Sequence, residues 1–129
     1  MAEVRVNPGL LQGNVTPPPA KSDAHRALIA AALSHHGTVI KGLPEPVSED
    51  IAATGRCLDA LMSGQPIMDC GESGTTLRLL IPVAAALPPG RRAEQLLFTG
   101  SGRLPKRPLA EYETVLQKAG LALSHPADA

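Results

Sequence analysis

The first group of residues that could do chemistry is Lys21-Ser22-Asp23-Ala24-His25-Arg26, which follows a proline-rich turn and begins a predicted helix. Ser22 and Arg26 are four residues apart and so share one helical face, and Lys21 lies just outside the first turn. Free backbone N–H groups, the positive end of the helix dipole, a hydroxyl and two cations would meet at one point, which suits a phosphate or carboxylate. The alternative is an ordinary serine N-cap with solvated Lys and Arg, and these six residues on their own favour it.

A second group, residues 69–78 (DCGESGTTLR), places two glycines and several small hydroxylic residues before an apolar helix. Glycine lets the backbone approach a ligand closely, and Arg78 follows Gly74 by one helical turn. The segment lacks the GKS/T ending of a Walker A loop, and the sequence contains no GxGxxG, so neither nucleotide-binding template is supported. A capped helix start with Arg78 solvated or structurally paired explains this segment equally well when it is taken alone.

A third group, residues 99–108 (TGSGRLPKRP), belongs to a locally positive segment with five basic residues and one acid between positions 91 and 107. Arg103, in a glycine loop, suits a bidentate grip on an anion. The alternative is a solvated loop, which we prefer for Arg91 and Arg92. Arg107 comes before a helix that starts with proline and fits either interpretation.

The overall composition excludes several classes of protein. Twelve basic and 12 acidic side chains in 129 residues, with 43% hydrophobic content, indicate a soluble globular chain that is one domain or part of one. The absence of a basic excess argues against a nucleic-acid or acidic-membrane binder. No apolar run is long enough for a membrane span and no signal peptide is recognisable, so we expect a cytoplasmic location.

Other chemistries find little support in the sequence. Cys57 and Cys70 are too few for a disulfide scaffold, which favours buried, reduced thiols. The four histidines show no metal-ligand spacing, and the pair at 35–36 is better explained by helix-end interactions. No nucleophile with a positioned base is recognisable. One Phe, one Tyr and no Trp leave a core of aliphatic side chains, so the chain could be only part of a folding unit.

The elements that must position these residues follow from hydrophobic periodicity, caps and breakers. Pro82 lies inside one predicted helix, where we expect a kink or local break. Strands that alternate with helices predict an α/β layered architecture. The predicted elements are weak strands near 4–6 and 10–15, a helix at 22–36, a strand at 38–43, a helix at 48–63, a strand or turn at 65–70, a helix at 74–87, a strand at 95–99, a helix at 108–119 and a strand at 121–124.

Together and in this order, the three groups resemble the 5-enolpyruvylshikimate-3-phosphate synthase family, the 3-phosphoshikimate 1-carboxyvinyltransferases. The resemblance covers about residues 4–120, which is under a third of the family's usual length. The related UDP-N-acetylglucosamine enolpyruvyl transferases usually carry Lys-Asn in place of Lys21-Ser22, so the shikimate branch is favoured. The matching residues are Pro18-Pro19-Ala20-Lys21-Ser22 with His25-Arg26-Ala27-Leu28, Asp69-Cys70-Gly71 with Ser73-Gly74-Thr75-Thr76-Leu77-Arg78-Leu79-Leu80, and Thr99-Gly100 with Arg103-Leu104 and Arg107-Pro108-Leu109.

The resemblance implies a fold, a reaction and a set of ligand contacts. The fold would be an inside-out α/β barrel lobe of βαβαββ units, only partly present: residues 1–16 would be opening strands that pack with the other lobe, and 17–129 a partial substrate-binding lobe. The reaction moves the enolpyruvyl group of phosphoenolpyruvate to the 5-hydroxyl of shikimate 3-phosphate and releases phosphate, without a cofactor or metal. Lys21, Ser22 and Arg26 would bind shikimate 3-phosphate. Phosphoenolpyruvate would contact Lys21, Gly74 and Arg103, with support from Glu72, Thr75, Arg78 and Arg107.

Two departures from the family pattern qualify these expectations. Most members have Asn at the position of Glu72, whose carboxylate would repel phosphoenolpyruvate unless it is paired or protonated. The family's proton-moving acids and a further lysine come from beyond residue 129, so we expect the isolated chain to be inactive, a truncation or one piece of a split enzyme. Faces meant for missing units would favour self-association. The rival interpretations are a fragment of the UDP-N-acetylglucosamine branch and a non-catalytic anion-binding module.

Overall fold

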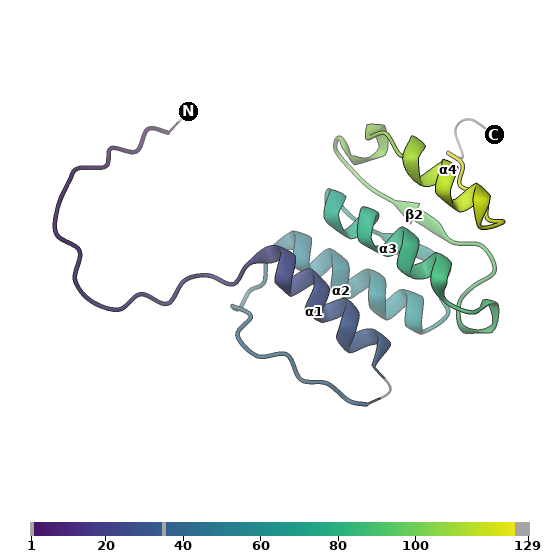
Figure 1. The fold of residues 1–129 in the computed structure, drawn as a ribbon, viewed down its shortest axis with the longest axis horizontal. Coiled ribbons are helices and arrows are strands. Elements are labelled where there is room, and N and C mark those ends of the chain that lie inside the picture. The colour runs from purple at the N-terminus through teal and green to yellow at the C-terminus, as the bar shows by residue number, and fades with distance from the viewer. Residues whose placement is uncertain (1, 35, 126–129) are drawn as a thin grey trace.

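A computed structural model describes residues 2–34 and 36–125, and in this part of the chain three helices lie side by side next to a small sheet (Figure 1). α1 packs on α2 and α2 packs on α3, and all three begin at the same end of the molecule. The elements are α1 (Lys21–Leu33), α2 (Glu49–Met62), β1 (Ile67–Asp69), α3 (Gly74–Ala86), the 3₁₀ turn η1 (Pro89–Arg91), β2 (Leu97–Thr99), the 3₁₀ turn η2 (Leu104–Lys106) and α4 (Ala110–Lys118).

Serine caps start the two central helices. The Ser48 hydroxyl accepts the backbone N–H of Ile51 at the start of α2, and the Ser73 hydroxyl accepts that of Thr76 at the start of α3, so each satisfies a donor with no partner inside its helix. The inner faces of these helices then bury an aliphatic core against β1, as the low aromatic content predicts. The core residues are Cys57, Leu58, Leu61, Met68, Cys70, Leu77, Leu80, Ile81, Ala84 and Leu104.

The two strands pair in parallel, with Ile67 opposite Leu97 and Asp69 opposite Thr99. A parallel pair needs a crossover connection, and α3 supplies it. Both strands therefore end at the same edge of the sheet, and the loops that follow them lie together. The Cys70 N–H donates to Thr99 O at 2.9 Å, and the Ser101 N–H donates to Gly71 O at 2.8 Å. The α/β class predicted from the sequence is confirmed in the form of this small parallel sheet.

The helices and central strands predicted from the sequence are confirmed, with shifted ends. α1 ends at Leu33, before the predicted residue 36, and His35 lies outside the described residues. α2, α3 and α4 fall within the predicted ranges, as do β1 and β2. The two 3₁₀ turns were not predicted, because three-residue turns leave no hydrophobic period to detect.

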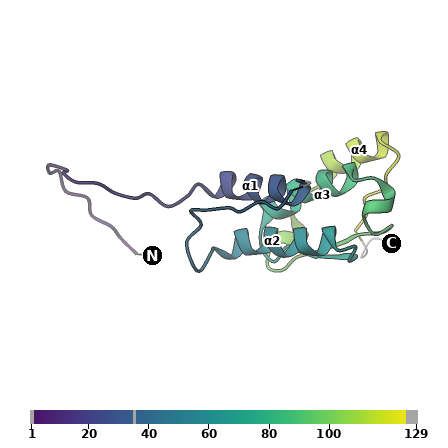
Figure 2. The ribbon, with the colours of Figure 1, turned by 90° about the horizontal axis from the view of Figure 1, so that it is seen from below.

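Four predicted strands are wrong for this structure: 4–6, 10–15, 38–43 and 121–124 form none. A strand exists only where its N–H and C=O groups find a neighbouring chain, and β-branched residues alone cannot supply one. Residues 2–20 instead lead away from the helices (Figure 2), with Val4 and Val6 exposed. The division of the chain at residues 16 and 17 stays a prediction.

Pro82 does not break α3, which runs without interruption from Gly74 to Ala86. Proline lacks an N–H, so the carbonyl of Arg78, four residues earlier, loses its usual partner in the helix. The hydroxyl of Tyr112 on α4 donates to this carbonyl at 3.0 Å. The predicted break is therefore absent, and the carbonyl freed by Pro82 becomes the polar attachment point of α4.

We expect Tyr112→Phe to lower the free energy of unfolding by about 1 kcal/mol, because it removes the side-chain hydrogen bond to the Arg78 carbonyl. In a Pro82→Ala background the new N–H of residue 82 donates to that carbonyl, and the same Tyr112 change costs less. Urea unfolding of the four proteins in this double-mutant cycle measures the coupling. Equal costs in the two backgrounds would contradict the assignment.

Candidate functional site

The first turns of α1, α2 and α3 meet at one end of the molecule. The Lys21 ammonium lies 3.5 Å from the Asp50 carboxylate, which joins the start of α1 to the first turn of α2. The Thr76 hydroxyl lies 3.3 Å from the Asp50 carbonyl oxygen, which joins the same turn to the start of α3. Because each helix N-terminus carries unsatisfied N–H groups and a partial positive charge, this end of the fold attracts anions.

The loops after β1 and β2 reach the start of α3. Gly71 and Gly102 adopt φ values of +57° and +61°, which side chains rarely tolerate, so both turns depend on glycine. At Gly100 the two loops touch: a β-carbon there would lie 3.1 Å from the Gly71 carbonyl oxygen. The glycines recognised in the sequence thus allow two loops to close on each other beside a helix N-terminus.

Arg107 lies directly against the first residue of α3. A β-carbon at Gly74 would collide with the Arg107 Nη1 and would lie 3.3 Å from its Cζ. Glycine at this position therefore lets the guanidinium reach the helix start. A guanidinium beside the positive end of a helix is electrostatically unfavourable alone, and an oxyanion between them would bond to both. The structure thus places Arg107 beside Gly74, and the ligand contacts expected of these two residues stay a prediction.

Glu72 packs against the other loop. A β-carbon at Gly102 would lie 3.0 Å from the Glu72 Cδ, so the carboxylate occupies the space above this glycine. In residues 2–34 and 36–125, no ion pair involves Glu72. Its negative charge thus lies over Gly102, the residue before Arg103, without a described cation bound to it, and its predicted effect on phosphoenolpyruvate stays a prediction.

The predicted residues on α1 are exposed. Ser22 is the second residue of the helix and does not cap it, since the N-cap is Ala20, which makes no side-chain cap bond. The alternative of an ordinary serine cap is therefore wrong. Arg26 forms an ion pair with Asp23 one turn earlier, and Lys21 forms one with Asp50.

The remaining predicted residues stay free for a ligand. Thr75, Arg78 and Arg103 are exposed, and their side chains make no hydrogen bond or ion pair with the described residues. The structure thus joins the first and second groups through Asp50 and the second and third through the paired loops. No group of three or more His, Cys, Asp or Glu side chains in the described part could hold a metal ion. Nor is any helix in that part long and apolar enough to cross a membrane.

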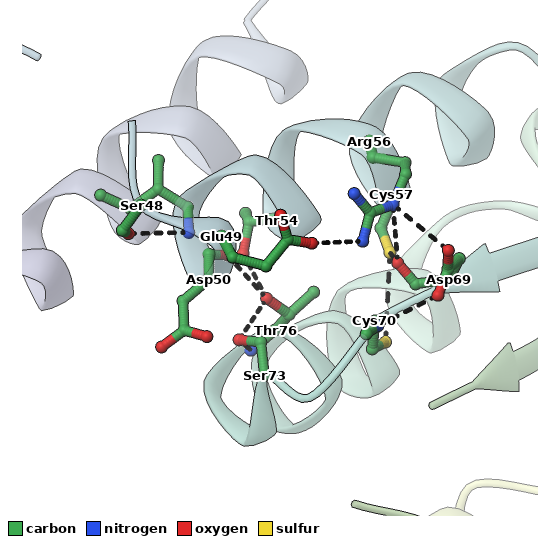
Figure 3. A network of polar contacts seen from close by, with 12 residues as sticks. Ser48, Glu49, Asp50, Thr54, Arg56, Cys57, Asp69, Cys70, Ser73 and Thr76 are labelled. Carbon is green, nitrogen blue, oxygen red and sulfur yellow. Dashed lines mark hydrogen bonds and ion pairs between the residues drawn. The ribbon is translucent and has the colours of Figure 1, made fainter. Parts of the chain in front are cut away.

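A buried polar chain under these helix starts was not predicted from the sequence. The His25 Nδ1 lies 2.6 Å from the Thr54 Oγ1. The Thr54 Oγ1 lies 2.7 Å from the Thr76 Oγ1, which in turn donates to the Ser73 Oγ at 2.7 Å (Figure 3). All four side chains are at most 3% exposed. The two bonds between helices join residues 29 and 22 positions apart, and a single sequence carries no signal of such pairs.

Burial lowers the pKa of His25, and the nearby Lys21 ammonium lowers it further, against the opposing effect of the Asp50 carboxylate. The imidazole is therefore held in its neutral form.

The two cysteines are free and fully buried, with their sulfurs 4.0 Å apart, as the sequence suggested. The hydrogen bond with Cys57, together with burial, raises the pKa of the Cys70 thiol.

Comparison with known proteins points to one family. Residues 6–65 match the EPSP synthase family, described as 3-phosphoshikimate 1-carboxyvinyltransferase. The curated protein of that name from Clostridium kluyveri is 38% identical over 91% of this chain, which corresponds to 30% of the relative. The one from Clostridium acetobutylicum is 33% identical over 95% of this chain, which corresponds to 32% of the relative. The chain thus spans about a third of the length of these relatives. No solved structure matches the chain significantly.

We expect acid to destabilise the fold through His25. Its pKa is lower in the folded chain than its ordinary value of 6.5, so the unfolded chain binds the proton first as the pH falls. The free energy of unfolding should therefore decrease as the pH drops below about 6.5 towards the lower folded pKa. Urea unfolding between about pH 5.5 and 7.5 measures this slope, which should be shallower for His25→Asn. Equal slopes would contradict a buried neutral imidazole.

Proposed function

The chain belongs to the EPSP synthase family, and we propose that it provides a substrate-binding part of a 3-phosphoshikimate 1-carboxyvinyltransferase. Such an enzyme transfers the enolpyruvyl group of phosphoenolpyruvate to the 5-hydroxyl of shikimate 3-phosphate and releases phosphate. The observation that carries the proposal is the meeting of three helix N-termini with Lys21 and Arg107 at one end of the fold. Both substrates are phosphorylated carboxylates, for which such an end is suited.

In this proposal the exposed start of α1 binds shikimate 3-phosphate through Lys21, Ser22 and Arg26. The absence of a capping bond from Ser22 leaves its hydroxyl available, and the helix start offers free N–H groups beside it. Asp23 and Asp50 hold the two cations while no ligand is bound. The phosphate then competes with two exposed carboxylates, whose ion pairs are weak in water.

Phosphoenolpyruvate is assigned to the neighbouring loops. Lys21, Gly74 and Arg103 would contact it, and Arg107 would close over the start of α3. Thr75 and Arg78 are exposed on the first turns of α3 and support the same anion. The fixed donors would also stabilise negative charge as a tetrahedral adduct forms and loses phosphate.

Glu72 sets a limit on this site. Its carboxylate lies in the loop before Gly74 and has no ion-pair partner among the described residues, so it would weaken phosphoenolpyruvate binding while ionised. A neighbouring Arg103 that turned towards it would offset that repulsion. The side chain is therefore assigned a tuning role, and no catalytic step is assigned to it.

The groups that move protons are assigned to parts of the enzyme outside this chain. The described site offers cations, hydroxyls and N–H groups, but no acid positioned as a general acid or base, and catalysis needs such groups held against both substrates. We therefore expect the isolated chain to bind substrate without turnover.

The barrel-lobe architecture is part of the same proposal. Exposed Val4, Leu10, Leu11 and Val15, and an open groove of about 830 Å³ along β2, fit packing against further units or a second copy.

Calorimetry with shikimate 3-phosphate tests the proposed function. We expect Lys21→Ala and Arg26→Ala each to weaken binding about tenfold, because each removes a charge-assisted contact to the ligand. Lys41→Ala, at an exposed lysine in the loop before α2, is the matched control and should bind normally.

Unchanged affinity in both variants would overturn the assignment of α1. Stronger binding of UDP-N-acetylglucosamine would instead place the chain in the related branch. A phosphate-release assay with both substrates completes the test. Turnover by the isolated chain would contradict its expected inactivity. Binding without turnover agrees with either an enzyme fragment or an anion-binding module. Restoring activity by adding the remainder of a relative separates those two.

A further inference from the structure

The Ser73 hydroxyl has a proton that it donates to no acceptor among the described residues. Its oxygen accepts the backbone N–H of Thr76 at 3.1 Å and the Thr76 hydroxyl at 2.7 Å. A serine oxygen has two acceptor positions, so both are filled, and its own proton is left. Among the described residues no acceptor receives that proton, although the side chain is only 3% exposed. A buried donor of this kind needs a partner.

The protons along the buried chain can be placed by counting. The Thr76 hydroxyl has two acceptors within reach, the Ser73 oxygen at 2.7 Å and the Asp50 carbonyl oxygen at 3.3 Å, and the shorter contact takes its single proton. In its contact with Thr54, Thr76 must therefore accept. Thr54 then gives its proton to Thr76 and must accept from His25. The Nδ1 of His25 is therefore the protonated nitrogen of a neutral imidazole. Every bond in the chain points from the imidazole towards Ser73, and the last proton is directed out of the network.

Ser73 precedes Gly74, the residue against which the Arg107 guanidinium lies. The unused donor, the free N–H groups of α3 and a cation thus share one place, and an oxyanion is the chemical group that bonds to all three. We propose that Ser73 donates a hydrogen bond to the phosphoenolpyruvate oxyanion and that His25 is a positioning residue that directs this donor. The inference rests on the proposed function, whose ligand it uses.

His25 and Thr54 act without touching the ligand. They are 2% and 0% exposed, and their bonds to the chain fix which atom of each hydroxyl carries the proton. Without the imidazole donor, the three hydroxyls could reverse their direction, and Ser73 would then donate inward to Thr76. The arrangement holds the donor ready before the ligand arrives, which reduces the ordering needed on binding.

The tautomer of His25 tests the proton count without any ligand. Nitrogen-15 NMR of the full chain labelled at histidine should show His25 protonated at Nδ1 near pH 7.5, whereas exposed histidines favour the other nitrogen. Thr54→Val keeps the side-chain shape but removes the acceptor, and it should shift His25 towards protonation at Nε2. Protonation at Nε2 in the unchanged chain would overturn the inference.

Ligand binding tests the role of Ser73. We expect Ser73→Ala to raise the Kd for phosphoenolpyruvate about tenfold, since it removes a hydrogen bond to a charged group, and to leave the Kd for shikimate 3-phosphate nearly unchanged. Ser48→Ala is the matched control, because Ser48 caps α2 as Ser73 caps α3, and its replacement removes a similar capping hydrogen bond. This control should bind phosphoenolpyruvate normally. Inorganic phosphate as a second probe shows whether the donor serves the phosphate group or the carboxylate.

The outcomes separate this inference from the proposed function. If shikimate 3-phosphate binding depends on Lys21 and Arg26 but Ser73→Ala and Ser48→Ala affect phosphoenolpyruvate equally, the role of Ser73 is refuted and the function stands. If neither substrate binds the unchanged chain, the proposed function and the ligand role of Ser73 both fail. In that case the tautomer still decides whether the proton chain itself is correct.

Discussion

The contact between the hydroxyls of Thr54 and Thr76, 2.7 Å apart and fully buried, is the interaction on which the other features depend. It joins α2 to α3 near the N-terminal ends of both helices, and the bond from His25 to Thr54 extends the connection to α1. Polar groups buried this deeply must be paired, so the helices cannot slide along one another without leaving a hydroxyl unsatisfied. The common starting level of the three helices follows from this requirement.

The common level has an electrostatic consequence. Three partial positive charges gather at one end, where Lys21 and Arg107 add two full charges and Asp50 offsets part of the total. Gly74 is small enough for the guanidinium to reach α3. The fold therefore holds donors and cations close together, at a cost in repulsion that a bound oxyanion would relieve. This is the physical link between the packing of the helices and the proposed binding of phosphorylated substrates.

The sequence predicted local features well and distant ones poorly. The serine caps, the glycine turns and the helical periods depend on neighbouring residues, so α2, α3 and the loops around Gly71 and Gly102 were recognisable. The exposed residues 4–15 show the opposite case, because a strand needs a partner that composition cannot reveal. The buried role of His25 was missed for the same reason: its partner is 29 positions away. Similarly, Pro82 predicted a kink or a local break, and α3 is unbroken because the hydroxyl of Tyr112 from another helix compensates for the missing bond.

The central claim is that the joined helix starts form one oxyanion site, and amide chemical shifts measure this directly. Inorganic phosphate added to the nitrogen-15-labelled chain should move the amide signals of residues 73–76 and of residues 100–107, the loop that follows β2, together and with one common Kd. The start of α1 should respond in the same titration. Signals at the far ends of α1, α2 and α3 should stay in place. Shifts spread evenly over the surface, or separate affinities at α1 and α3 with no response at residues 73–76, would contradict the account.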